Sequence, residues 1–202
     1  MRNISNRQVS LIIKPVVFLL CLMPFVMLLI ATIDDNLGTN PVETLTHETG
    51  QWALRFLLIG LAVTPLRRLL KTAWLIKFRR MLGLFAFFYA TLHFITYLWL
   101  DQFFDWHEII IDIPKRPFIT IGFVSLLLLL PLVLTSTNAM QRRLGKKWLA
   151  LHKLVYVIPV LVLIHFVWSL KVDYSEPLSY ALVLILLLLM RLIYDRKKAL
   201  QV

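Results

Sequence analysis

Six apolar stretches, each bounded by polar or charged residues, dominate the pattern of this chain. They cover Leu11–Ile33, Ala53–Leu66, Met81–Leu100, Phe118–Ser136, Trp148–Leu170 and Leu178–Tyr194. A helix of about 20 apolar residues crosses a hydrocarbon core about 30 Å thick, and the second stretch is the shortest and weakest of the set. The pattern predicts an all-α membrane protein in which residues 1–202 form one domain, a bundle of six transmembrane helices.

Basic residues are distributed unevenly between the two sides of these predicted spans. One side has Arg2, Arg7, Lys14, Arg67, Arg68, Lys71, Lys77, Arg79, Arg80, Arg142, Arg143, Lys146, Lys147, Lys153, Arg191, Arg196, Lys197 and Lys198. The other side has only Arg55, Lys115, Arg116 and Lys171, together with every acidic residue except Asp195. Because cytoplasmic loops carry an excess of Lys and Arg, both termini are predicted to be cytoplasmic.

The composition agrees with an integral membrane protein. The 202 residues are 59% hydrophobic and 16% charged, with a mean hydropathy of +0.78. The net charge of +11 sits in short clusters at the ends of apolar stretches, which argues against nucleic-acid binding and for contact with anionic membrane lipid. The first stretch is longer than a signal-peptide core and has no small-residue cleavage site, so we expect a retained span.

Histidines within the apolar stretches are the main candidates for chemistry. His93, His152 and His165 fall inside predicted spans, where an ionisable side chain is costly and by default functional. Counted from the cytoplasmic ends of their spans at about 1.5 Å per residue, they lie about 18, 6 and 25 Å deep. His93 and His165 are therefore predicted to hold a haem in the outer half of the membrane. Since Cys21 is the only cysteine, that haem would be non-covalent.

His152 has no histidine opposite it. It precedes His165 by thirteen residues, which on an ideal helix places the two side chains some 140° apart. Arg79 stands where a matching inner ligand would lie on the third span. His152 could serve an inner haem, a shared ligand set, or a flavin or quinone site. With two imidazoles on iron no coordination position stays open, which favours electron transfer.

The polar residues outside the spans allow weaker predictions. The segment TNPVETLTHETGQW predicts a short surface helix that begins at Pro41 and ends near Gly50. His47 in this segment and His107 in a later outer connection are interpreted as solvated loop histidines. Arg55, just inside the second span, is equally compatible with interfacial snorkelling and with binding a haem propionate. We find no internal repeat in the sequence.

Three segments carry a resemblance to a known family. They read NPVETLTHETGQWALRFLL, RRMLGLFAFFYATLHFITY and LTSTNAMQRRLGKKWLALHKLVYVIPVLVLIHFVWS. They are similar to the MsrQ (YedZ) family, the haem-binding membrane subunits of the bacterial periplasmic protein-methionine-sulfoxide reductase system, within the ferric-reductase-like transmembrane group. The resemblance implies a six-helix b-type cytochrome of the bacterial inner membrane. It implies His93, His152 and His165 as haem-ligand positions.

The resemblance also implies partners. Electrons would come from the quinone pool or a separate flavin reductase, with FMN as a candidate second cofactor. They would pass to a periplasmic molybdopterin catalytic subunit, in a heterodimer that reduces methionine sulfoxide in oxidised envelope proteins. This sequence departs from the wider group at Arg79 or its neighbour Arg80, where an inner histidine is expected. A full second bis-histidine haem is therefore not implied.

Two other functions stay open at this point. A stand-alone ferric reductase would need flavin and nicotinamide domains, but the six glycines form no GxGxxG motif and we expect no soluble domain after Val202. A haem-free small transporter or assembly factor would need carboxylates within its spans, and none is clearly placed there. We therefore expect an electron-transfer subunit of an oxidoreductase complex rather than its catalytic subunit.

Overall fold

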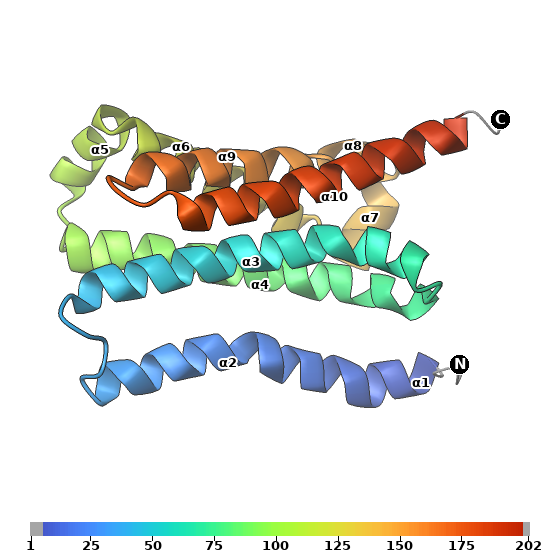
Figure 1. The fold of residues 1–202 in the computed structure, drawn as a ribbon, viewed down its shortest axis with the longest axis horizontal. Coiled ribbons are helices and arrows are strands. Elements are labelled where there is room, and N and C mark those ends of the chain that lie inside the picture. Colours follow the sequence, from blue (N-terminus) through green and yellow to red (C-terminus); the bar gives the residue numbers. More distant parts are fainter. Residues whose placement is uncertain (1–5, 200–202) are drawn as a thin grey trace.

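The computed structural model describes residues 6–199, which form a bundle of long helices lying side by side (Figure 1). In chain order the elements are α1 (Asn6–Gln8), η1 (Val9–Ile13), α2 (Lys14–Ile33), α3 (Pro41–Leu69), η2 (Ala73–Phe78), α4 (Arg79–Thr96), η3 (Tyr97–Asp101), α5 (Trp106–Lys115), α6 (Pro117–Leu134), α7 (Asn138–Leu144), α8 (Lys146–Leu151), α9 (Leu154–Ser169) and α10 (Ser175–Ala199). No strand occurs within residues 6–199. The all-α prediction is confirmed.

Five segments have the length and apolar character of membrane spans. They are Leu11–Ile33, Ala73–Asp101, Pro117–Leu134, Lys146–Ser169 and Ser175–Tyr194. Each contains or overlaps one of the predicted apolar stretches, so a multi-pass membrane protein is confirmed. The remaining predicted stretch lies in α3, whose first half carries several charged and polar side chains. This helix runs along the bundle beside α4 (Figure 1), and the count of six spans stays a prediction.

The helix α3 begins where the sequence predicts and ends elsewhere. Asn40 caps its start by accepting the backbone N–H of Glu43, and Pro41 occupies its first turn. The helix then continues for 29 residues without a break. The predicted end of a short surface helix near Gly50 is therefore wrong. Gly50 lies inside the helix, and a side chain from α4 occupies the space beside it, as described below.

The fifth apolar stretch is not one continuous helix. The chain leaves α-helical geometry at His152, whose ψ is −1°, between α8 and α9. Both the backbone N–H of His152 and its ring Nδ1 lie at hydrogen-bond distance from the carbonyl of Trp148, at 2.9 and 3.1 Å. A side chain that competes for a helical carbonyl in this way disturbs the ladder. The ideal-helix angle between His152 and His165 therefore does not apply.

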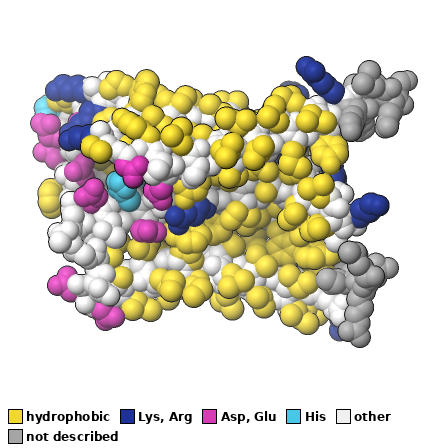
Figure 2. Space-filling model, in the orientation of Figure 1, with side chains coloured by type: hydrophobic (Ala, Val, Ile, Leu, Met, Phe, Trp, Pro, Cys, Tyr) yellow, Lys and Arg dark blue, Asp and Glu magenta, His cyan; other side chains and the backbone are white. Residues whose placement is uncertain are grey.

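The two ends of the bundle differ in charge (Figure 2). Acidic residues gather at the end formed by the α2–α3, α4–α5 and α9–α10 connections, here called the acidic end; they include Asp34, Asp35, Asp101, Asp105, Glu108, Asp173 and Glu176. The opposite end, here called the basic end, holds both described chain ends (Figure 1). Arg2, which contributes to the topology prediction, lies outside the described residues.

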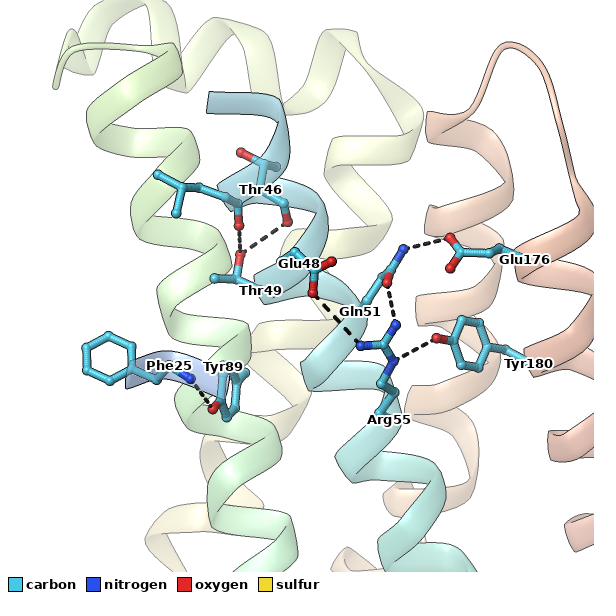
Figure 3. A network of polar contacts seen from close by, with 10 residues as sticks. Phe25, Thr46, Glu48, Thr49, Gln51, Arg55, Tyr89, Glu176 and Tyr180 are labelled. Carbon is cyan, nitrogen blue, oxygen red and sulfur yellow. Dashed lines mark hydrogen bonds and ion pairs between the residues drawn. The ribbon is translucent and has the colours of Figure 1, made fainter. Parts of the chain in front are cut away.

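Tyr89 of α4 fastens α2 to the rest of the bundle. Its side chain is fully buried, and its hydroxyl accepts the backbone N–H of Phe25 at 3.0 Å (Figure 3). The same hydroxyl donates to the carbonyl of Cys21 at 2.9 Å. In an unbroken α-helix these two backbone groups bond to each other. Pro24 lies inside the same turn. The tyrosine hydroxyl therefore binds both backbone groups of one turn of α2, the turn that contains Pro24.

Replacing Tyr89 by Phe should weaken the attachment of α2. The change Tyr89→Phe removes a buried hydroxyl and leaves its two backbone partners without it, which costs about 1–3 kcal/mol. We expect the free energy of unfolding in detergent micelles to fall by that amount in denaturant titrations followed by circular dichroism. Tyr174→Phe, at a ring that is 45% exposed, is the control. Unchanged stability of Tyr89→Phe would show that the N–H of Phe25 and the carbonyl of Cys21 are satisfied within α2 without the tyrosine hydroxyl.

Candidate functional site

A cavity of about 260 Å³ lies between α3, α4, α6 and α9. Its inner wall is apolar, with Ala53, Leu54, Leu57, Ala90, Leu126, Leu129 and Val162. Its rim, toward the acidic end, is polar, with Thr46, His47, Gln51, Asp101, Arg116 and Ser169. An apolar interior with a few polar groups at one side is the usual form of a site for a largely apolar ligand.

Two histidines face each other in this cavity. His93 comes from α4 and His165 from α9, and their ring centroids lie 5.9 Å apart with the planes at 77°. A metal–imidazole bond is about 2.0–2.1 Å and the ring centre lies roughly 1 Å beyond the nitrogen, so two imidazoles on opposite sides of one metal have centres roughly 6 Å apart. The spacing of His93 and His165 therefore suits one metal ion between them.

The hydrogen bonds of both rings select the tautomer that binds metals. Nδ1 of His93 lies 2.9 Å from the carbonyl oxygen of Thr46, and Nδ1 of His165 lies 2.7 Å from that of Phe118. A carbonyl only accepts, so each Nδ1 carries the hydrogen and donates it. Each Nε2 is then left as a lone-pair donor. This is the arrangement by which backbone carbonyls orient metal-binding histidines and raise their basicity.

A glycine lies beside each ring. A Cβ atom placed on Gly50 would lie 3.0 Å from Nδ1 of His93, and one on Gly122 would lie 2.8 Å from Nδ1 of His165. Each glycine follows the accepting carbonyl by four residues, so in a regular helix its own N–H bonds to that carbonyl. A carbonyl oxygen has two lone pairs and can accept both hydrogens. Because glycine has no side chain, the imidazole N–H can reach the second lone pair of that carbonyl oxygen.

The same contact occurs twice, on α3–α4 and on α6–α9. The carbonyl, the glycine and the histidine of the second copy each lie 72 residues after those of the first, at 46 and 118, 50 and 122, and 93 and 165. The two copies share little sequence besides the glycine and a His-Phe pair, so comparing residue identities does not reveal them. The sequence thus has no internal repeat, and the repeated contact is visible only in the structure.

His152 lies away from this cavity. Its ring stacks on Trp148 with centroids 3.9 Å apart, and the indole Nε1 of that tryptophan donates to the carbonyl of Thr135 at 2.9 Å. The positively charged side chain of Arg79 interacts electrostatically with the His152 ring. Among the described residues, the charged group close enough to act electrostatically on His152 is thus an arginine and not a second histidine. Its role as a haem ligand stays a prediction.

Arg55 belongs to a polar network that connects α3 to α10 (Figure 3). Its Nε donates to the hydroxyl of Tyr180 at 2.8 Å, its Nη2 donates to Oε1 of Gln51 at 2.6 Å, and its Nη1 lies 4.0 Å from Glu48. Gln51 in turn donates to Glu176 at 2.6 Å. Arg55 does not line the cavity, and its role as a propionate partner stays a prediction.

Two rim residues were not singled out for this site by the sequence analysis. His47 is exposed, as predicted, but it lies in α3 and lines the cavity instead of occupying a loop. Arg116 lines the same rim and forms an ion pair with Asp112 at 2.7 Å. His107 is exposed on α5 and is not part of the cavity. A glycine inside a helix three residues after His47 was the available signal that this part of α3 packs closely.

Comparisons with known proteins agree with this arrangement. The family model described as "Ferric reductase like transmembrane component" matches residues 49–167, a range that contains both glycines and all three histidines of the predicted spans. No solved structure matches the chain.

Curated relatives cover most of the chain. A protein of Herminiimonas arsenicoxydans is 50% identical over 197 residues, which are 96% of this chain and 90% of the relative. One of Rhodospirillum rubrum is 51% identical over 178 residues (88% and 86%), and one of Azospira oryzae is 50% identical over 186 residues (91% and 79%). Each is named "Protein-methionine-sulfoxide reductase heme-binding subunit MsrQ". On these matches the chain belongs to the MsrQ family, whose members have a ferric-reductase-like transmembrane domain.

Proposed function

We propose that this protein is a b-type, haem-binding electron-transfer subunit in which His93 and His165 are the two iron ligands. The observation that carries the proposal is the pair of imidazoles in an apolar cavity, each with its Nδ1 on a backbone carbonyl and its Nε2 left to bind. The names of the MsrQ relatives, which include "heme-binding subunit", support it. A haem held by two imidazoles supplies one-electron transfer, because its iron has no open position for a substrate.

The residues of the chain have separate tasks in this proposal. The carbonyls of Thr46 and Phe118 hold the two rings in orientation and strengthen their Nε2 atoms as ligands. Gly50 and Gly122 keep the space in which those rings lie. The leucine-rich inner wall excludes water, and a water-poor shell is one of the factors that adjust the reduction potential of a metal site.

We further propose a topology of six spans with α3 as the second. Both described chain ends lie at the basic end (Figure 1), as an even number of crossings requires. An excess of Lys and Arg marks cytoplasmic segments, so the basic end and both termini face the cytoplasm and the acidic end faces the periplasm. Residues 1–202 then form one domain in the bacterial inner membrane.

The two ends of the bundle are proposed to serve electron entry and exit. Electrons enter at the basic end from the quinone pool or a flavin reductase, with FMN as a second cofactor. His152 follows α8 and Arg79 begins α4, both toward the basic end (Figure 1), and we assign electron entry to this region. Electrons leave near the cavity rim to a periplasmic molybdopterin subunit that reduces methionine sulfoxide in oxidised envelope proteins. The name shared by the relatives, a subunit of a protein-methionine-sulfoxide reductase, supports a partner of this kind.

Removing either proposed ligand should abolish the haem spectrum. We expect His93→Ala and His165→Ala each to lose most of the low-spin b-type spectrum, because one imidazole cannot complete the six-coordinate iron. The measurement is the reduced-minus-oxidised spectrum and the pyridine haemochrome per mole of purified protein, with flavin quantified on the same sample. His107→Ala, at an exposed histidine outside the cavity, is the control. A b-type spectrum that survives both ligand changes would reject the assignment.

Adding a methyl group at either glycine should displace the adjacent ring. Gly122→Ala places its Cβ 2.8 Å from a ring atom, and Gly50→Ala places it at 3.0 Å, so we expect haem content to fall severalfold in the first variant and less in the second. Gly83→Ala is the matched control, since a Cβ there meets nothing within 4 Å. Equal haem content in all three variants would show that the rings do not need this space.

Reporter fusions test the topology. With α3 crossing the membrane, alkaline phosphatase fused after Gly38 should be active, and the same enzyme fused after Lys71 should be inactive, because phosphatase folds only in the periplasm. Green fluorescent protein at these two positions should give the opposite pattern. Equal reporter activity after Gly38 and Lys71 would mean that α3 does not span the membrane.

A further inference from the structure

Two cavity-lining side chains, Tyr97 and Arg116, are connected through the carboxylate of Asp112. Oδ1 of Asp112 accepts from Nε of Arg116 at 2.7 Å, and Oδ2 of Asp112 accepts from the hydroxyl of Tyr97 at 3.0 Å. The side chain of Asp112 is 12% exposed, and that of Arg116 is 50% exposed. Both oxygens of the carboxylate are thus engaged, and one edge of the guanidinium is fixed. Its two terminal nitrogens have no hydrogen-bond partner within residues 6–199.

The backbone explains why these residues meet. Helix α5 ends at Lys115 and α6 begins at Pro117, with Arg116 between them in an extended conformation. Asp112 lies one turn earlier in α5, so the pair has the i, i+4 spacing that favours ion pairs. Phe118, whose carbonyl orients the ring of His165, follows Arg116 by two residues. The arginine is therefore positioned by the same stretch of chain that positions one proposed iron ligand.

Arg116 is the only arginine or lysine among the cavity-lining residues that the structure describes. The other titratable groups of the rim are His47, Tyr97 and Asp101. Asp101 would repel an anion, which leaves the side of Arg116 as the favourable place for negative charge. Arg55, the other arginine near this end of the bundle, is engaged with Gln51 and Tyr180 instead.

We propose that Arg116 binds a carboxylate side chain of the haem, and that Asp112 and Tyr97 are its positioning residues. The inference rests on the proposed function. Haem carries two propionates, and an ionised carboxylate is costly in an apolar cavity unless it is paired or reaches water. An arginine with free terminal nitrogens at the polar rim offers the planar pair of donors that carboxylates bind. The structure thus favours Arg116 for the propionate role that the sequence suggested for Arg55.

Haem release is the first measurement. Charge-assisted hydrogen bonds contribute about 1.5–3 kcal/mol, so we expect Arg116→Gln to raise the rate of haem transfer to apomyoglobin roughly tenfold or more. Arg55→Gln, which removes the same charge outside the cavity, should change that rate by less than about threefold. Tyr97→Phe changes no charge but removes the hydrogen bond that holds Asp112 in place. We therefore expect a smaller increase in the rate of haem transfer. A rate for Arg116→Gln equal to wild type would overturn the proposal.

The pH dependence of the midpoint potential is the second measurement. Beside Arg116 the propionate stays ionised, so the potential should change little with pH around neutrality. In Arg116→Gln the carboxylate can take up a proton when the iron is reduced, so the potential should fall as pH rises. Arg116→Lys keeps a positive charge and should restore the flat profile. A purely structural role of Arg116 would not move this profile, and identical profiles of Arg116→Gln and wild type would overturn the inference.

Haem dimethyl ester separates the inference from the proposed function. This haem has no ionised propionates, so wild type and Arg116→Gln should release it at equal rates after reconstitution of apoprotein. The same rate ratio with ester and with haem would overturn the role of Arg116 and leave the iron ligands intact. A wild-type protein that binds no haem, or binds it without His93 and His165, would instead overturn the proposed function and with it this inference.

Discussion

Two imidazoles in an apolar helical bundle depend on a partner for every ring nitrogen, because an unpaired polar group in a water-poor interior costs free energy. In this protein the carbonyls of Thr46 and Phe118 take the Nδ1 hydrogens of His93 and His165. Those carbonyls lie inside helices, where the next turn normally covers them, and only a glycine one turn later leaves room for a second donor. The close approach of α3 to α4, and of α6 to α9, follows from this requirement.

The sequence predicts depth along the membrane better than direction around a helix. Because a helix rises by a constant amount per residue, counting along two apolar stretches was enough to bring His93 and His165 to similar depth, and the structure places their rings 5.9 Å apart. The direction of Arg55 depends on which neighbours it meets, Gln51 and Tyr180. Those contacts arise from packing between α3 and α10, which no single stretch of sequence specifies.

Helix boundaries were hardest to predict where glycine and histidine have more than one structural use. Gly50 was interpreted as a helix end, which is its commonest meaning, but here its missing Cβ admits a ring from α4. His152 interrupts the fifth stretch by competing for the carbonyl of Trp148. The repeated contact at 72-residue spacing consists of a carbonyl, a glycine and a histidine. Because every residue has a carbonyl, the sequence cannot show which carbonyl accepts the histidine N–H.

The docking of α4 on α2 adds hydrogen bonds from one side chain of α4 to the backbone of α2. Alone in the membrane, the N–H of Phe25 and the carbonyl of Cys21 can satisfy each other within one helix, as insertion into lipid requires. When α4 arrives, its Tyr89 hydroxyl adds two hydrogen bonds between the helices, one to each of these backbone groups. The first helix can therefore be inserted early in synthesis without its partner and still be recognised later by a specific backbone position. Lipid, which has no such donor and acceptor in its hydrocarbon layer, cannot compete for that position.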